Sequence, residues 1–456
     1  MKRQSYLIYA IALMLTVTSC HIYKPYSRQE IDTEGLYREQ ITSENDSASL
    51  ADISWSDLFT DTNLQLLIEK ALENNFDLRS AMLTIEQAEA MLRRSKAAFA
   101  PTLSAGLNGN YTIGENHSTK TWNGMLNTSW EIDIFGKLLN SKRAAKAALM
   151  QSEAYKCAVQ TRLIANVATL YYTLLTLDEQ LKITEATLGY WKESVKTMEL
   201  LMQAGMVNQA AVVQSRANRY GIETTIPDLK RQIQETENAL SVLLGRLPGS
   251  IERGTIKQQQ FPQVVTTGVP SLLLANRPDV KQAESELMIA YAQTNIARSM
   301  LYPSVVISAN GGYSNSIFGA ITNPAQLLGS VAGGLTQPIF NGLALTSQLK
   351  VTKKEEEKAV LAFEKTLLNA GIEVSNALFN YQILDWKIDS RGKQIEELEK
   401  SVEYTQELLK SGSSNYLEVL TSQQALLSAQ IGRASDTFEK VQSIIKLYAA
   451  LGGGSK

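Results

Sequence analysis

The chain of 456 residues carries a formal net charge of −2, which argues against a nucleic-acid partner, because binding phosphates needs clustered positive charge. Its two histidines, His21 and His117, have no cysteine or carboxylate neighbours at metal-ligand spacing, so we expect no metal and no bound cofactor. No glycine-rich phosphate loop, Ser-His-Asp grouping or HExxH motif occurs, so the sequence offers no catalytic residue and favours a conduit or scaffold over an enzyme.

The first 20 residues predict export and a lipid anchor. Lys2 and Arg3 precede an apolar run from Tyr6 to Val17, which is too short to span a bilayer as a helix. The run ends in Val-Thr-Ser-Cys, and small residues before Cys20 resemble a bacterial lipobox. We therefore predict a signal peptide over residues 1–19 and a lipidated segment over 20–60, with a covalent lipid on Cys20. The alternative is an ordinary signal peptide followed by a chance cysteine.

Two further expectations concern the mature chain. Lipidation of Cys20 would leave Cys157 without an intrachain partner, so we expect no disulfide and a small, packed Cys157 side chain. No later stretch approaches 18 consecutive apolar residues, so no transmembrane helix is expected after the signal peptide.

The rest of the chain is two tandem copies of one unit. Pro101 matches Pro303 at an offset of 202, Ile134 matches Ile339 at 205, and from residue 167 onward the offset is 207. We assign the first copy to residues 61–245, a connecting segment to 246–270 and the second copy to 271–452. The unit is far longer than the roughly 20–50 residues of solenoid repeats, so it is a duplicated half-molecule.

Each copy contains a predicted strand hairpin, over residues 101–134 and 303–338, with polar loops at 112–121 and 314–325. Apolar and polar residues alternate along these strands. Strands of about ten residues with aromatic residues near their ends suit a tilted crossing of an outer membrane. A soluble hairpin with one buried face gives the same alternation. In a membrane, the lipid-facing residues would be Leu103, Leu107, Trp122, Leu126, Val305, Ile307 and Val331.

A helix of unusual length follows each hairpin. Residues 136–204 and 343–411 contain no proline, and a continuous helix of this size is about 100 Å long. Shorter helices near 207–244 and 414–450 complete two antiparallel helical hairpins, whose tips lie near Gly205 and Gly412. Small residues along the first long helix indicate close, coiled-coil-like packing, with a plain elongated bundle as the alternative. These small residues are Ala144, Ala147, Ala148, Ala154, Ala158, Ala165 and Ala168.

Four strands per chain are too few for a transmembrane barrel, since the smallest such barrels have eight strands. An open sheet in lipid would leave the backbone groups at its edges unpaired. If the strands lie in a membrane, several chains must therefore share one barrel, and cyclic symmetry is the usual solution. Strand number alone does not choose between two, three or more chains.

Five motifs resemble those of a known family. They are Arg277-Pro278-Asp279-Val280 opening a helix, WEIDIFGK (130–137) and LTQPIFNG (335–342) at the strand-to-helix junctions, NYLEVL (415–420) after the second tip, and ALGGG (450–454) near the end. In this order, duplicated and behind a lipobox, they resemble the TolC family of outer-membrane efflux ducts. The resemblance is closest to the lipidated branch, the outer-membrane factors of RND-type pumps, and covers the chain from about Trp55 to Gly454.

The resemblance implies a mixed, mainly α-helical fold and a homotrimer. Three chains would share a twelve-stranded β-barrel in the outer membrane of a Gram-negative bacterium, and their helical hairpins would continue it as a trimeric α-barrel across the periplasm. The tips would close as a gate and dock with a periplasmic adaptor (membrane fusion) protein and an inner-membrane RND-type transporter. Residues near 178–192, 246–272 and both termini would form a belt around the α-barrel.

In this family, acidic side chains one turn inside the second tip ring the constriction. The first acidic position corresponds to Glu418, and the second corresponds to Thr421, so only one acidic ring is retained. Tyr416 and Arg216 are the candidate partners of Glu418, with a solvated helix-face role as the alternative for Arg216, and Leu417 is the next candidate for the constriction. The adaptor-contacting tips would be Gly205, Met206, Val207, Asn208, Gly412, Ser413, Ser414 and Asn415.

The implied function is passive conduction of small molecules, such as drugs or toxic compounds, from the adaptor and pump to the outside. The alternative is the outer-membrane duct of a type I protein secretion system, fed by an ABC transporter. A structural coiled-coil lipoprotein is the third hypothesis, and the strand hairpins count against it. The lipobox and the terminal ALGGG favour efflux, and the resemblance implies that selectivity for the exported compound lies mainly in the pump.

Overall fold

The structure, a computed structural model, describes residues 26–28, 36, 50, 53–113, 118–259, 276–314, 327–413 and 416–454. Cys20, His21, His117 and the predicted signal peptide lie outside these residues. The chain divides into two compact units. Unit 1 comprises Met1–Ile31, Leu83–Glu153 and Gln282–Lys365, and unit 2 comprises Asp32–Met82, Ala154–Lys281 and Thr366–Lys456. Each of the two sequence copies contributes to both units.

Helices make up most of the described chain. They are α2 (Trp55–Leu58), α3 (Thr62–Asn74), α4 (Phe76–Ala97), α5 (Lys137–Gln203), α6 (Gln209–Leu243), α8 (Pro278–Ser299), α10 (Ala344–Lys410) and α11 (Tyr416–Ala450), with a 3-10 turn at Ile256–Gln258. The predicted long and short helices are confirmed: α5 and α10 have 67 residues each, and α6 and α11 have 35 each. None of the helices in the described ranges combines the length and apolarity that a membrane-spanning helix needs.

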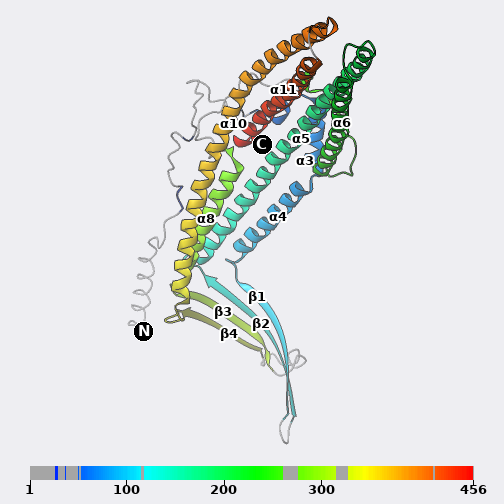
Figure 1. Cartoon of the computed structure of the whole chain (residues 1–456). Helices are drawn as coiled ribbons and strands as arrows, with labels where there is room; N and C mark the ends of the chain where they lie inside the picture. The colour runs from blue at the N-terminus through cyan, green and yellow to red at the C-terminus, as the bar shows by residue number, and fades with distance from the viewer. Residues whose placement is uncertain are drawn as a thin grey trace. The chain divides into compact units, whose positions relative to one another are not determined.

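Unit 1 contains a four-stranded antiparallel sheet, with its strands in chain order (Figure 1). The strands are β1 (Thr102–Ile113), β2 (Ser118–Ile132), β3 (Ser304–Ser314) and β4 (Leu327–Thr336). Both predicted hairpins are confirmed, but the loop predicted over 112–121 is wrong, because Thr112 and Ile113 pair with Thr119 and Ser118. The polar composition of 118–121 concealed the strand, although β-branched Thr119 and Thr121 fit a paired strand well.

The register places the predicted apolar residues on one face of the sheet, because residues directly opposite each other in an antiparallel pair share a face. Successive partners on the apolar face include Ala105, Leu126, Gly311 and Gly329. Successive partners on the other face include Ser104, Asn127, Asn310 and Ser330. The predicted alternation of faces is therefore confirmed across all four strands. Ser314 belongs to β3, and the rest of the loop predicted over 314–325 lies outside the described residues.

The apolar face is largely uncovered by the rest of the described chain. Leu103 and Leu107 are each 74% exposed, and Val331 is 78% exposed. Trp122 and Leu126 are also exposed, whereas Val305 and Ile307 are half-buried. A soluble hairpin with a buried apolar face is thus not formed within one chain. An apolar surface of this kind requires lipid or a partner.

The motif WEIDIFGK fixes the start of α5. Asp133 Oδ2 accepts a hydrogen bond from the Leu139 amide at 2.7 Å, and Lys137 Nζ donates to Glu131 at 2.9 Å. The chain turns into the helix at Gly136, whose φ of 71° suits glycine. In the second copy Gly342 and Leu343 both have this conformation, with φ of 64° and 66°, and Leu343 lies 207 residues after Gly136.

Two hydrogen bonds in unit 2 lie at equivalent positions of the two sequence copies. Asn75 Nδ2 donates to the Leu243 carbonyl at 3.0 Å, and Arg277 Nη1 donates to the Ala450 carbonyl at 2.8 Å. Positions 75 and 277 differ by 202, and positions 243 and 450 differ by 207. Each bond ties the residue before one helix, α4 or α8, to the end of another, α6 or α11.

Glycine follows both of these helix ends. Gly245 and Gly452 have φ of 64° and 89°, and a Cβ on either would lie within 2.6 Å of a neighbouring backbone carbonyl oxygen. Only glycine combines this conformation with this close approach.

The small residues of α5 are buried or half-buried, which agrees with close packing along this helix. Cys157 is half-buried and free among the described residues, and its expected lack of a disulfide partner stays a prediction because Cys20 lies outside them. Buried small residues are Ala144, Ala147, Ala154 and Ala168, and half-buried ones are Ala148, Ala158 and Ala165.

Candidate gate at the helix tips

The first predicted tip lies between α5 and α6. Gly205 has φ of 72°, and the Met206 amide donates to the Leu201 carbonyl at 2.9 Å, which closes the end of α5. Asn208 begins α6 by accepting a hydrogen bond from the Ala211 amide at 3.1 Å. The Met206 side chain is 54% exposed, so this tip presents an apolar side chain to its surroundings.

The second predicted tip has the same construction. Gly412 also has φ of 72°, and the Ser413 amide donates to the Leu408 carbonyl at 2.9 Å. Ser414 and Asn415 lie outside the described residues, and α11 begins at Tyr416. Both tip positions derived from the repeat are therefore confirmed as helix-ending turns, while their contact with an adaptor stays a prediction.

Glu418 lies in the first turn of α11 and is exposed, and its role at a gate stays a prediction. Leu417 beside it is 64% exposed. The Thr421 side chain is uncharged, and its hydroxyl donates a hydrogen bond to the Leu417 carbonyl of the same helix at 2.8 Å. The side chains at 417, 418 and 421 therefore share the open surface of α11.

Tyr416 does not lie beside them. Its side chain is only 7% exposed and packs in a cluster with Trp191, Met198, Val212 and Leu420. Its hydroxyl has no hydrogen-bond partner among the residues that the structure describes. The prediction that Tyr416 is a polar partner of Glu418 is not supported within one chain. Its ring packs in the interior, and the sequence pattern did not predict this apolar packing.

Arg216 has a partner that the sequence did not suggest. Its Nε donates to Glu199 Oε1 at 3.1 Å, and the two residues form an ion pair between α6 and α5. Because these helices run antiparallel from the tip at 205–208, positions 199 and 216 face each other across the hairpin. Within one chain, Arg216 is thus paired with Glu199, and counting residues outward from the tip would have found this pair.

An ion-pair network holds α10 against α11. Asp436 is 2% exposed and contacts Lys387 Nζ at 2.7 Å and Arg391 Nε at 2.9 Å. Lys387 also contacts Glu439 at 3.2 Å. Burial opposes ionisation of Asp436, but the hydrogen bonds from Lys387 and Arg391 outweigh burial and lower the pKa of its carboxyl. The sequence alone did not identify this network.

Replacing Asp436 with asparagine should lower the free energy of unfolding by about 1–3 kcal/mol at pH 7, because two cations lose their anion while staying partly hydrated. A lowered folded-state pKa stabilises the protein above the ordinary carboxyl pKa of about 3.9, and this contribution is lost as pH falls through the lower folded value. The difference between wild type and Asp436→Asn should thus be constant from pH 7 to about 5 and shrink below about 4.

Thermal and urea unfolding across this pH range measure that difference. Asp389→Asn is the matched control, since Asp389 pairs with Lys393 on the same helix but is 63% exposed. Its effect should stay below about 0.5 kcal/mol. Equal effects of the two substitutions would show that the buried network contributes no more to the free energy of unfolding than an exposed ion pair does.

The segments predicted to form a belt meet in unit 2. Arg253 Nε donates to Asp178 at 2.6 Å, and Lys257 contacts Glu179 at 2.8 Å. Hydrogen bonding to Asp178, which outweighs partial burial, raises the pKa of Arg253. These contacts join residues 178–179 to residues 253–257, the belt around an α-barrel stays a prediction, and residues 260–272 lie outside the described residues.

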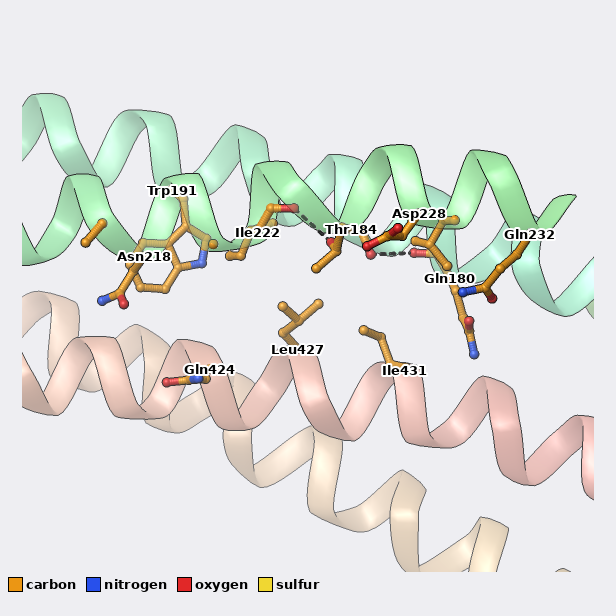
Figure 2. Close-up of a pocket in the computed structure, with 14 residues that line it drawn as sticks. Gln180, Thr184, Trp191, Asn218, Ile222, Asp228, Gln232, Gln424, Leu427 and Ile431 are labelled. Carbon is orange, nitrogen blue, oxygen red and sulfur yellow. Dashed lines mark hydrogen bonds between the residues drawn. The ribbon is translucent and has the colours of Figure 1, made fainter. Parts of the chain in front are cut away.

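A cavity of about 550 Å³ separates the first helical hairpin from α11. Figure 2 shows Trp191 and Asn218 on the α5–α6 side, with Leu427 and Ile431 on α11 facing them. The Trp191 ring nitrogen and the Asn218 amide nitrogen are buried without hydrogen-bond partners in the described chain. Packing between the hairpin and α11 is thus incomplete along this stretch.

Known proteins resemble this chain along most of its length. The family model described as outer membrane efflux protein matches residues 67–246 and 269–453. Cation efflux system protein CusC of Escherichia coli O6:H1 is 29% identical over 451 residues, which cover 96% of this chain and 97% of that protein. Solvent efflux pump outer membrane protein SrpC of Pseudomonas putida is 30% identical over 407 residues, 87% of each chain. A crystal structure of CusC matches with a TM-score of 0.86 and 26% identity, over 95% of this chain and 100% of that one.

Proposed function

The chain belongs to the outer membrane efflux protein family, and on this premise we propose that it is the outer-membrane exit duct of a tripartite efflux system. It conducts small molecules, such as drugs or toxic compounds, passively from a periplasmic adaptor and an inner-membrane RND-type transporter to the outside. This role needs no catalytic step. The observation that carries the proposal is a sheet with an exposed apolar face whose strands lead directly into helices of 67 residues.

Three chains sharing one barrel would complete both the sheet and the helical layer. β1 and β4 are the edges of the sheet, and the unit 1 stretch of α4, residues 83–97, has no buried residue. A barrel of twelve strands pairs the backbone edges that an open sheet would expose to lipid. The duplicated sequence supports this arrangement, because each chain boundary then repeats the junction between the two copies within a chain.

The repeat also identifies the helices that meet at the chain boundary. Within the chain, Arg143 and Lys146 of α5 line a cavity together with Met288 and Tyr291 of α8. At the offset of 207, Arg143 and Lys146 correspond to Lys350 and Lys353 of α10. At the offset of 202, Met288 and Tyr291 correspond to Glu86 and Glu89 of α4. All four are exposed in the single chain. We infer that α10 of one chain packs beside α4 of the next, with lysines facing glutamates.

The gate lies at the tips, with Glu418 as its one acidic ring. The cavity between α5–α6 and α11 leaves α11 loosely packed around Leu427 and Ile431, while Tyr416 and Leu420 tie its first turns to α5 and α6, so the tips would move together. The Arg216–Glu199 pair keeps the first hairpin together during such a shift. A closed state and an open state of similar free energy would let an adaptor bias the equilibrium.

Cys20→Ser should abolish acylation, because serine offers no thiol for the lipid. Metabolic labelling with a radioactive fatty acid and the mass of the mature protein report the change. The barrel should still insert, since twelve shared strands supply most of the membrane attachment. Cys157→Ser, which alters the other cysteine, is the matched control and should label normally. Label that persists on the Cys20→Ser protein would refute the lipobox assignment.

The names of the two relatives favour efflux over protein secretion, and CusC and SrpC are named for different cargoes, cations and solvents. Their nearly equal identity to this chain gives neither cargo priority. The loss of an acid at Thr421 gives no support to a cation. A purely structural coiled-coil lipoprotein leaves the exposed apolar sheet face without a purpose.

The proposal is tested by export from whole cells. Cells without the gene should retain a fluorescent efflux substrate after loading, and a plasmid copy should restore its release. Restoration must depend on the inner-membrane pump, so deletion of the pump should abolish it. Release that a plasmid copy restores equally in the presence and absence of the pump would contradict the tripartite role.

A further inference from the structure

A basic cavity of about 280 Å³ lies in unit 1, where the first turns of α5 meet α8. Arg143 and Lys146 of α5, Met288 and Tyr291 of α8, and Tyr26 of the N-terminal segment contribute to its lining. No acidic side chain lines it, and the first acid along α5 is at position 153. The lining residues therefore provide two cations and an aromatic hydroxyl but no negative charge.

Tyr26 is held in place but has an unused donor. Its ring packs edge-on against Tyr291, with centroids 5.8 Å apart, and the neighbouring Arg28 pairs with Glu284. The Tyr26 hydroxyl is buried and has no hydrogen-bond partner among the described residues. Burial, followed by the charge of Glu284, raises the pKa of Tyr26, so the hydroxyl keeps its proton. A buried O–H without an acceptor indicates a missing ligand or water.

The predicted lipid anchor on Cys20 limits how far this cavity would lie from the membrane. Tyr26 is six residues after Cys20, and six residues span at most about 20 Å. A lipid anchor on Cys20 lies outside the barrel, so the wall that Tyr26 covers is also on the outside and close to the membrane surface. Arg143 and Lys146 are six and nine residues into α5, about 9 and 14 Å from its start, and helical side chains lean toward that start.

We propose that this cavity binds the phosphate of an anionic phospholipid headgroup, of the phosphatidylglycerol type, in the periplasmic leaflet of the outer membrane. The inference rests on the proposed lipidated, outer-membrane location. Tyr26 donates a hydrogen bond to a phosphate oxygen, and the Arg143 guanidinium and Lys146 ammonium neutralise its charge. The apolar side chains of Met150 and Met288, which also line the cavity, suit the acyl-proximal part of the lipid.

Native mass spectrometry of the purified full-length protein counts the lipids that stay bound after exchange into detergent containing phosphatidylglycerol or phosphatidylcholine. Wild type should retain about one phosphatidylglycerol per chain and several-fold less phosphatidylcholine. Arg143→Gln with Lys146→Gln should lose this retention, and Tyr26→Phe should reduce it several-fold by removing only the hydroxyl. Lys192→Gln with Lys196→Gln, an equal charge change at exposed positions of the same helix, should retain lipid as wild type does.

Planar-bilayer conductance of the same samples separates the two proposals. Normal channels with normal lipid retention in the Arg143/Lys146 variant would overturn the headgroup site and leave the duct intact. Equal lipid loss in the Lys192/Lys196 control would also overturn it, because general charge would then explain retention. Displacement of the lipid by inorganic phosphate at equal concentration would identify a free-phosphate site and overturn the lipid assignment. Absence of channels in wild type would instead refute the proposed function.

Discussion

Leu107→Arg should nearly abolish stable insertion of the protein into the outer membrane. Leu107 lies in the middle of β1, is 74% exposed and belongs to the uncovered apolar face. An arginine facing lipid near the bilayer midplane costs roughly 2–4 kcal/mol, and a barrel shared by three chains incurs this cost in every chain. The expected result is loss of the heat-resistant oligomer from outer-membrane fractions, measured by semi-native electrophoresis.

The neighbouring position provides the control for this experiment. Asn108 lies at the same depth of β1 but on the polar face, opposite Asn123. An arginine there points into a water-filled lumen, so Asn108→Arg should insert nearly as well as wild type. Equal loss of oligomer in both variants would contradict the assignment of faces, and equal tolerance would contradict a membrane location for the sheet.

Substitutions at Glu418 should change ion conduction through the trimer. In the proposed trimer, three copies of this carboxylate around one axis would repel each other, which would disfavour the closed tip and favour cations in the pore. Glu418→Gln removes the repulsion and should lower the open probability in planar bilayers. Glu418→Lys keeps the repulsion but reverses its sign, so the channel should stay open and shift its preference from cations toward anions.

A related substitution tests the hairpin behind the gate. Arg216→Glu would place two carboxylates together at the Arg216–Glu199 pair and should loosen the first tip, with higher resting conductance and greater sensitivity of cells to bulky antibiotics. Lys257→Gln, which removes a pair with Glu179 away from the tips, should change neither. If conductance is unaltered by every substitution at 216 and 418, the constriction lies elsewhere, with Leu417 as the next candidate.

Features with local or periodic causes could be predicted from the sequence. The long helices end within two residues of their predicted limits, because Gly205 and Gly412 stop them in a conformation that favours glycine. The faces of the strands follow from period-two alternation and match the register. The sequence predicts a loop over residues 118–121 because all four are polar, and only their pairing with β1 reveals them as the start of β2.

Ionic partners were harder to predict, because they depend on how helices are rotated against each other. Proximity to the tips predicts Arg216 as a partner of Glu418, yet the hairpin geometry pairs Arg216 with Glu199. Asp436 gave no signal in the sequence, since a carboxylate on a helix is usually solvated, and its burial between Lys387 and Arg391 emerges only when α10 and α11 pack. The hydroxyl of Tyr416 beside the tip predicts a polar contact, although most of the side chain is apolar and buried.

The register of the shared barrel can be derived in advance. Across one chain, Ser104, Asn127, Asn310 and Ser330 lie opposite one another in turn. At the chain boundary, β4 of one chain would meet β1 of the next chain as β2 meets β3 within a chain. Asn127 corresponds to Ala332 at the offset of 205, and Asn310 corresponds to Asn108 at the offset of 202. Ala332 then lies opposite Asn108 of the next chain, and Ser330 lies opposite Asn110. The row of paired residues that starts at Ser104 of one chain therefore reaches Asn110 of the next chain. This is a shift along the strand of six residues, or about 20 Å, for every four strands. Four strands side by side are about 19 Å wide. A shift of about 20 Å along the strands over this width corresponds to a strand tilt of about 45° from the barrel axis, as in known barrels.

Disulfide trapping in intact outer membranes tests this shared barrel most directly. In a Cys157→Ala background, chains carrying Asn108→Cys and Ala332→Cys should form covalent oligomers on mild oxidation, and the ladder should stop at trimer. β1 and β4 of one chain are about 14 Å apart, too far for an internal disulfide. Thr102→Cys with Ala332→Cys, displaced by about 20 Å, should stay monomeric, and Gly106 or Asn110 partners should cross-link less than Asn108. A ladder that ends at three supports one barrel of twelve strands, whereas monomers alone, or a ladder that continues past three, would contradict it.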